Sequence, residues 1–184
     1  YLRFARSASA PLSPEIHRRF EERFNIPIIE TMGLTETGSQ ITTNPLPPAI
    51  RKIGSPGTAF GNEIMIGDDT LAAVPAGTVG EILVRGANVM QGYLNQPEET
   101  AKTISSDGWL RTGDLGYLDQ DGYVFVSGRI KELIIKGGEN IAPREIDEAL
   151  LEHEAVLEAA AFAVPCENYG ERVEACIRLK EQVQ

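Results

Sequence analysis

Apolar and polar residues follow different patterns in three parts of the chain, and the first pattern predicts an α/β unit. Residues 1–40 read as strand, helix, strand and loop, with the first strand at residues 1–4. Ile16, Phe20 and Phe24 recur at a spacing of four, which places them on one face of the helix. We expect this face to be buried, because an apolar stripe on a helix usually faces the core.

Local signals mark both ends of this helix. Ser13 is suited to cap its N-terminus, and Pro14 is suited to the first helical position. Asn25 and Pro27 predict its end. The apolar pair at residues 28–29 then begins a short strand, so the unit reads as the last part of a larger α/β domain.

The middle of the chain, residues 41–127, has the pattern of a small β-barrel or sandwich. Short apolar runs at 63–66 and 81–84 are separated by frequent glycines and prolines, which are typical of strands joined by turns. An Asp-Gly pair at 121–122 predicts a hairpin, and residues 97–103 predict a short helix.

From residue 132 onward, the pattern predicts a small α+β module. Apolar runs on both sides of the Gly pair at 137–138 predict a hairpin, and Pro143 begins a helix with three apolar residues on one face. These three residues are Ile146, Ala149 and Leu150. Two strands follow, at 156–164 and 172–179.

Composition limits the classes of partner. The chain has 184 residues, of which 42% are hydrophobic and 24% charged, as is usual for a globular protein. Its net charge of -10 argues against a nucleic-acid or anionic-membrane partner, because phosphates attract Lys and Arg. No apolar run approaches the ~20 residues that a membrane helix requires. Two cysteines, Cys166 and Cys176, indicate reduced, buried thiols of a cytoplasmic protein.

Polar motifs with candidate chemistry are concentrated between residues 112 and 140. They are Thr-Gly-Asp at 112–114, Asp-Gly-Tyr at 121–123, Gly-Arg-Ile-Lys-Glu at 128–132 and Gly-Gly-Glu-Asn at 137–140. A carboxylate and a guanidinium suit the hydroxyls of a ribose, and a pair of glycines lets the backbone approach a ligand closely. Nearer the N-terminus, residues 32–38 place a Thr hydroxyl beside a carboxylate, which can meet a phosphate and its Mg²⁺.

In order and spacing, these motifs resemble those of the adenylate-forming superfamily, which includes acyl-CoA synthetases, luciferases and peptide-synthetase adenylation domains. The resemblance covers essentially the whole chain and implies an α/β and α+β architecture. Residues 1–128 would end the large domain with an α/β unit and a small β-barrel, 129–131 would form a hinge, and 132–184 would be part of the small α+β domain. The family's phosphate loop and final catalytic lysine would lie outside the chain, so we expect an inactive fragment of an active enzyme.

The resemblance implies nucleotide contacts for residues 30–36. Thr35 would contact the ATP phosphates, and Glu36 would help to hold Mg²⁺. Glu30, Thr31 and Met32 would line the adenine. The family usually has an aromatic residue where Met32 stands, and a Met can also pack flat against a base.

The resemblance also implies roles for four later residues. Asp114 would accept hydrogen bonds from the ribose hydroxyls, and Arg129 would contact the ribose or phosphate. Lys131 would be the pivot on which the small domain turns. Gly138 would help to admit the pantetheine thiol of coenzyme A.

Each of these motifs also has a plainer interpretation. Residues 35–36 can form an ordinary polar turn, and Asp114 can be a turn former. The charges at 128–132 can be a solvated strand end, and a Gly pair often serves only a hairpin turn. His17 and His153 read as surface residues.

The residues and the resemblance together predict a ligase that joins a small carboxylic acid to coenzyme A, using ATP and Mg²⁺. An adenylation domain that loads a carrier protein is the nearest alternative. A non-catalytic nucleotide-binding or interaction module of the same fold is the second. Residues 40–48 resemble small-dicarboxylate ligases of the oxalate type, but those relatives tend to have a His where Ser39 stands. The sequence leaves the oligomeric state open.

Overall fold

Residues 1–180 are described by a computed structural model of the protein, in which the chain divides into two units, Tyr1–Val126 and Ser127–Gln184. The last four residues of the predicted 132–184 module lie outside the described residues. The predicted mixture of α/β and α+β structure is confirmed. The hinge at 129–131 stays a prediction.

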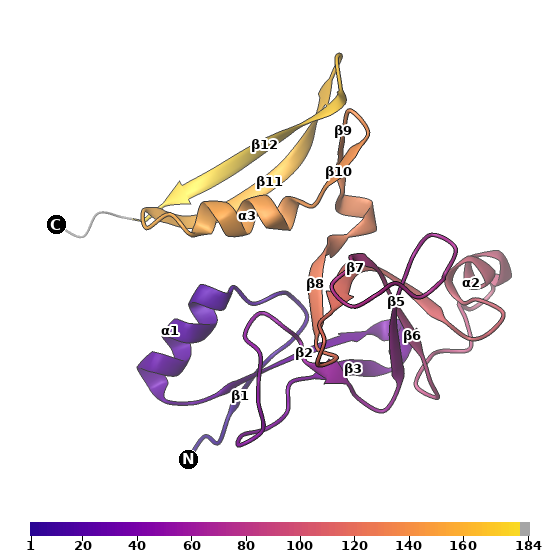
Figure 1. Ribbon diagram of the computed structural model, residues 1–184, viewed down its shortest axis with the longest axis horizontal. Helices are drawn as coiled ribbons and strands as arrows, with labels where there is room; N and C mark the ends of the chain where they lie inside the picture. The colour runs from indigo at the N-terminus through magenta and orange to yellow at the C-terminus, as the bar shows by residue number, and fades with distance from the viewer. Residues whose placement is uncertain (181–184) are drawn as a thin grey trace. The chain divides into compact units, whose positions relative to one another are not determined.

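Residues 1–129 contain two four-stranded sheets (Figure 1). One has the strand order β1-β2-β3-β4, in which β1 and β2 are parallel and the other pairs antiparallel. The other has the order β5-β6-β7-β8, in which β6 pairs antiparallel with both neighbours. The strands are β1 (Ala5–Ser7), β2 (Ile28–Leu34), β3 (Ser39–Thr43), β4 (Thr58–Ala59), β5 (Glu63–Gly67), β6 (Gly80–Arg85), β7 (Leu110–Leu118) and β8 (Val124–Arg129).

The core of the second sheet also contacts the first. Ile66, Ile82 and Val124 form a buried cluster, and Met32 of β2 packs against it. The hairpin predicted at 121–122 joins β7 to β8, and the expected helix at 97–103 is α2 (Pro97–Thr103). The expected strand at residues 1–4 is wrong, because the first strand begins at Ala5 and pairs with β2.

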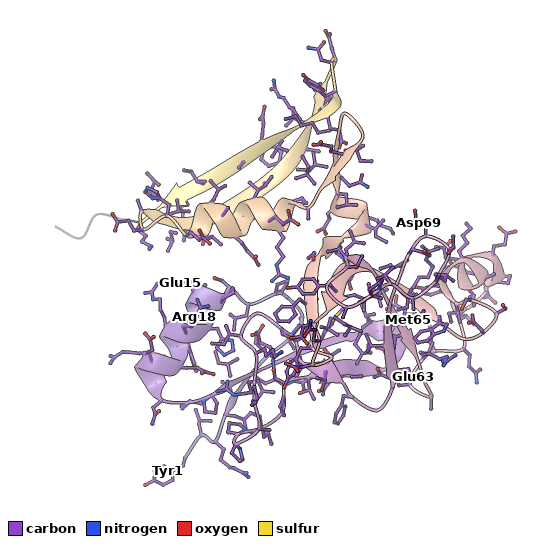
Figure 2. All side chains as sticks on the ribbon, viewed as in Figure 1. Tyr1, Glu15, Arg18, Glu63, Met65 and Asp69 are labelled. Atoms are coloured by element: carbon purple, nitrogen blue, oxygen red, sulfur yellow. The ribbon has the colours of Figure 1, made fainter. Side chains whose placement is uncertain are left out.

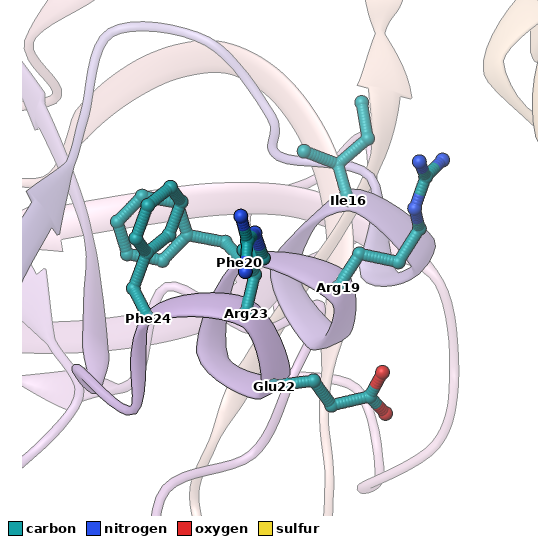
Figure 3. A pocket seen from close by; sticks show the side chains of 6 residues that line it. All are labelled: Ile16, Arg19, Phe20, Glu22, Arg23 and Phe24. Carbon is teal, nitrogen blue, oxygen red and sulfur yellow. The ribbon is translucent and has the colours of Figure 1, made fainter.

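Helix α1 (Pro14–Phe24) ends as predicted, but its apolar face is not buried. Ile16 and Phe24 are each 56% exposed. Figure 3 shows them beside Phe20, around an open hollow on the helix surface. Glu15 and Arg18 are also exposed on α1 (Figure 2). The spacing therefore identified one apolar face correctly, but the polar face is the one that meets the sheet.

The two ends of α1 differ in how well they match the expected caps. Asn25 adopts a left-handed conformation, and its amide donates to the Glu21 carbonyl, which closes the C-terminus. Ser13 occupies the N-cap position, but its hydroxyl makes no capping hydrogen bond. Pro14 at the first helical position needs no amide partner, so the helix starts without this cap.

His17 is fully buried, so the expectation of a surface residue was wrong. Its Nδ1 lies 2.8 Å from Oε1 of Glu30 on β2, and its Nε2 lies 2.9 Å from Oε1 of Glu21 on α1. A buried polar ring is costly unless its nitrogens are hydrogen-bonded. Both carboxylates meet this requirement and connect α1 to β2 through one imidazole.

Both carboxylates have further donors. Glu30 Oε1 accepts from the Gly54 amide at 3.1 Å, and Glu21 Oε1 accepts from the Ile28 amide at 2.7 Å. Arg51 forms an ion pair with Glu21. Burial raises the pKa of the Glu21 carboxyl, but the hydrogen bonds from Arg51, Ile28 and His17 outweigh this and lower it to about 2.

Residues 127–180 contain a four-stranded sheet in the order β10-β9-β12-β11, with one helix packed on β11. A short 3₁₀ turn, η2 (Ile130–Glu132), precedes it. The elements are β9 (Ile134–Lys136), β10 (Glu139–Ile141), α3 (Pro143–Leu151), β11 (Val156–Cys166) and β12 (Gly170–Leu179). They confirm the predicted order of hairpin, helix and two strands.

Three expectations for side chains in this unit had different outcomes. His153 is exposed, as predicted. Ala149 is also exposed, so the predicted apolar face of α3 is narrower than expected. Cys166 and Cys176 are free thiols, but Cys176 is exposed and Cys166 only half-buried, because both lie on the β11–β12 hairpin rather than in a core. Across residues 1–180, every helix falls short of the length and hydrophobicity that a membrane span requires.

The contacts of Glu21 predict a specific dependence of stability on pH. Its folded-state pKa of about 2 lies below the ordinary value of 4.5. Its contribution to the free energy of unfolding is therefore present above pH 4.5 and is lost as the pH falls towards 2. Glu21→Gln should lower the free energy of unfolding at pH 7 by roughly 1–3 kcal/mol and weaken this acid dependence.

Urea unfolding at a series of pH values measures both effects. Glu22→Gln is the matched control, because Glu22 is an exposed neighbour on the same helix. Equal acid dependence in the wild type and Glu21→Gln would contradict the assignment.

Candidate functional site

Thr35 and Glu36 lie in a short 3₁₀ turn, η1 (Thr35–Thr37), that directly follows β2. The buried Thr37 hydroxyl donates to the Leu34 carbonyl at 3.0 Å, so the turn is closed on itself. Gly38 ends it with a left-handed φ of 63°. The side chain of Thr35 is left exposed and that of Glu36 half-buried, as a contact with a phosphate and its metal would require.

The Glu36 carboxylate is oriented by Tyr93. The Tyr93 hydroxyl donates to Glu36 Oε1 at 2.9 Å, and the Met90 amide donates to the Glu36 carbonyl at 2.8 Å. The Tyr93 amide in turn donates to the Thr100 hydroxyl of α2 at 2.9 Å. The hydrogen bond to Glu36 and the burial of the ring raise the pKa of Tyr93.

Tyr93 is a residue whose part in this site the sequence reasoning missed. A phenol in a loop just before a helix was the available signal, because a half-buried Tyr hydroxyl usually has a polar partner. The partner itself lies 57 residues away and could not be inferred from spacing.

The Glu36 carboxylate is compatible with a Mg²⁺ ion that is bound partly by the protein and partly by the phosphates of a nucleotide. Within residues 1–180, no group of three His, Cys, Asp or Glu side chains could hold a metal ion by itself. Mg²⁺ often binds one or two carboxylates together with substrate phosphates and water. Glu36 fits this arrangement, because Tyr93 engages only Oε1.

Residues 30–32, expected to line the adenine, present their side chains in different directions. Along β2, Glu30 and Met32 point to one face and Thr31 to the other. The Glu30 carboxylate is engaged by His17, and Met32 packs on the core of the second sheet. The Thr31 hydroxyl lies 3.3 Å from the Ser7 carbonyl, to which it donates. The three side chains therefore do not all face one adenine. A contact between the adenine and the backbone of residues 30–32 stays a prediction.

Asp114 lies on β7 and is 8% exposed. Its amide donates to the Thr112 hydroxyl at 3.0 Å, and that hydroxyl donates to the Ile82 carbonyl at 2.7 Å. Met32 of β2 packs on the cluster that contains Ile82, so β2 and the segment before Asp114 both contact the same core.

The turn before Asp114 is fixed by a buried carboxylate. Glu81 of β6 accepts from the Gly113 amide at 3.0 Å and from Arg111 Nε at 2.8 Å. Gly113 has a φ of 73°, a left-handed conformation that glycine adopts without steric cost. Asp114 is therefore held in a defined position at a turn within β7. A place in this turn is compatible with the expected role of its carboxylate as an acceptor for ribose hydroxyls.

Arg129, Lys131 and Gly138 follow the boundary after Val126, in the second unit. Arg129 ends β8, and Lys131 is exposed in η2. Gly138 lies in the β9–β10 turn with a φ of 91°, and a Cβ there would meet no atom within 4 Å. Backbone conformation therefore explains this glycine in the described structure. The ligand roles of the three residues stay predictions.

Comparisons with known proteins agree with the order of these motifs. Residues 1–94 match the family model of the AMP-binding enzyme, and residues 145–184 match that of the AMP-binding enzyme C-terminal domain. The chain is 57% identical over 181 residues to the sulfoacetate–CoA ligase of Cupriavidus necator, covering 98% of this chain and 35% of that protein. It is 43% identical to the oxalate–CoA ligase of Saccharomyces cerevisiae, covering 98% and 34% respectively.

The fold has a solved counterpart as well. The crystal structure of ATP-bound MatB from Rhodopseudomonas palustris superposes with a TM-score of 0.91 at 38% identity, covering 95% of this chain and 35% of that one. The chain thus spans about a third of the length of the curated relatives it matches.

The Glu36–Tyr93 contact predicts a change in the titration of one tyrosine. Glu36→Gln should lower the pKa of Tyr93 towards the ordinary value of 10.0, because the acceptor charge that stabilises its neutral form is removed. NMR of ¹³Cζ-labelled tyrosine across pH 8 to 12 measures this. Glu98→Gln is the control, since Glu98 is exposed on α2. An unchanged Tyr93 titration in Glu36→Gln would show that the two side chains do not interact.

Proposed function

Because the chain belongs to the AMP-binding enzyme family, we propose that the whole protein is an AMP-forming ligase that joins a small carboxylic acid to coenzyme A. The observation that carries this proposal is the oriented Glu36 carboxylate, which directly follows Thr35 at the end of β2. The names of the similar proteins support the acceptor, since both are CoA ligases.

We further propose that the acid is short and carries a second anionic group. The two similar ligases are named for sulfoacetate and oxalate, which share this property. The relative with 57% identity is a sulfoacetate–CoA ligase. A sulfonate as the second anionic group agrees with Ser39, which stands where oxalate-type ligases tend to have a His.

In the first half-reaction, an oxygen of the substrate carboxylate attacks the α-phosphorus of ATP. The bond from that phosphorus to the oxygen that bridges the α- and β-phosphates breaks. Acyl-AMP forms, and pyrophosphate is the leaving group. Thr35 is suited to donate its hydroxyl to a phosphate oxygen, and Glu36 to hold a metal ion. When bound, Mg²⁺ would offset the negative charge of the phosphates. The role of this chain in the step is positioning, which reduces the entropic part of the barrier.

The ribose is the second anchor in this proposal. The Asp114 carboxylate would accept hydrogen bonds from the two hydroxyls, and Arg129 would contact the ribose or phosphate. Asp114 suits this task because hydrogen bonds to Thr112 and Glu81 fix its turn. Binding of the ribose would therefore cost little conformational entropy of this segment.

In the second half-reaction, the thiol of coenzyme A attacks the acyl carbonyl and loses its proton to the surroundings. The bond from the carbonyl carbon to the AMP oxygen breaks, and AMP leaves with the thioester as the other product. We propose that Lys131 is the pivot of the domain rotation between the two steps and that Gly138 helps to admit the thiol. An exposed residue in a short turn is suited to absorb such a change.

Pyrophosphate release by the whole protein tests this function. With ATP, Mg²⁺ and a panel of carboxylic acids, we expect release that depends on an acid, and a thioester only when coenzyme A is present. Release without a thioester would favour a carrier protein as acceptor. No release with any acid would contradict ligase activity and favour the non-catalytic module.

The 184-residue chain by itself should release no pyrophosphate under the same conditions. The resemblance assigns the phosphate loop and the final lysine to other parts of the enzyme, and electrostatic stabilisation of this kind is usually the largest catalytic contribution. Acid-dependent release by this chain alone would contradict that assignment.

A further inference from the structure

Arg6 joins the three strands that lead into and out of the candidate site. From β1, its Nε donates to the Thr31 hydroxyl of β2 at 3.1 Å, and its Nη2 donates to Gln40 Oε1 of β3 at 2.9 Å. Gln40 is paired in register with Gly33, two residues before Thr35. The guanidinium therefore lies over the strands on either side of the turn that carries Thr35 and Glu36.

The charge of Arg6 is not neutralised by these contacts. Thr31 and Gln40 are both neutral, and among residues 1–180 no carboxylate forms an ion pair with Arg6. Three other arginines of the first unit are paired with carboxylates. These pairs are Arg51–Glu21, Arg85–Glu63 and Arg111–Glu81. Four further arginines of this unit have no carboxylate partner among the described contacts: Arg3, Arg18, Arg19 and Arg23. Arg6 differs from these four because two neutral acceptors hold its guanidinium in place.

Arg6 also has the donors to bind an anion without giving up its present contacts. A guanidinium carries five N–H donors in a planar fork, and Arg6 uses two of them. The three that remain are on the terminal nitrogens. The side chain is exposed, so these donors are accessible in the described structure. Such a fork binds carboxylate and similar oxyanions in a bidentate manner.

We propose that Arg6 is a specificity-determining residue that binds the second anionic group of the acid. The inference rests on the proposed function, because it assigns the recognition of that substrate class to one side chain. Thr31 and Gln40 act as positioning residues that hold the fork in place. A monoanionic acid of the same length leaves the fork without a partner and is selected against.

The test compares two acids that differ by the second anion, sulfoacetate and acetate, in pyrophosphate release by the whole protein. The variants are Arg6→Gln, Arg6→Lys and the control Arg3→Gln, which removes an exposed positive charge near β1. Arg6→Gln should lower kcat/KM for sulfoacetate about 10- to 100-fold, the range for a lost hydrogen bond to a charged group. Its kcat/KM for acetate and its KM for ATP should stay within about 2-fold of wild type.

The lysine variant separates charge from geometry. Arg6→Lys should fall between wild type and Arg6→Gln for sulfoacetate, because an ammonium keeps the charge but not the fork. Arg3→Gln should change neither acid. If Arg6→Gln does not fold, Arg6→Lys carries the test, with a loss of kcat/KM for sulfoacetate and none for acetate.

Two results would overturn the role of Arg6 while leaving the proposed function in place. One is an equal loss for both acids in the Arg6 variants, which would indicate a general structural role. The other is a wild type that uses acetate as well as sulfoacetate. Wild-type protein that releases no pyrophosphate with any acid would overturn the proposed function and this inference together.

Discussion

The buried contact between His17 and Glu30 is the interaction on which the position of β2 depends. A carboxylate with 6% exposure is costly in a protein unless its oxygens are hydrogen-bonded, and the imidazole and the Gly54 amide supply those bonds. The other ring nitrogen binds Glu21, which Arg51 holds in turn. Helix α1 therefore meets the sheet through a polar network rather than an apolar seam. A polar network of this kind specifies one register, because a shifted strand would leave a buried charge without a partner.

From β2, the site extends through two further contacts. Met32 packs on the cluster that contains Ile82, next to the hydrogen bonds that fix the turn before Asp114. At the end of the strand, the Glu36 carboxylate is held by Tyr93, whose backbone is anchored on α2. The turn after β2, the loop at Tyr93 and β7 thus each contribute polar groups that hydrogen bonds hold in place. Fixed groups of this kind reduce the ordering cost of binding a nucleotide.

Much of the fold followed from local patterns, whereas the networks that hold the site did not. The Asp-Gly hairpin at 121–122 and the C-terminus of α1 at Asn25 depend on a few neighbouring residues, so spacing and turn chemistry predicted them. The burial of His17 depends on Glu30, 13 residues away, and the role of Tyr93 depends on a partner 57 residues away. Amphipathic spacing marks an apolar stripe but not what covers it, and for α1 it led to the wrong buried face. The motif residues Thr35, Glu36 and Asp114 were identified by their resemblance to the motifs of the adenylate-forming superfamily.

The most direct test of the account is whether Asp114 recognises the ribose hydroxyls. Calorimetry of the whole protein should compare AMP with 2′,3′-dideoxy-AMP, in the wild type and in Asp114→Asn. We predict that the wild type binds AMP more tightly than the dideoxy analogue by about 10- to 100-fold, the range for hydrogen bonds to a charged acceptor. The variant should bind the two nucleotides with nearly equal affinity. A variant that keeps the full wild-type preference for AMP would contradict the assignment of this site.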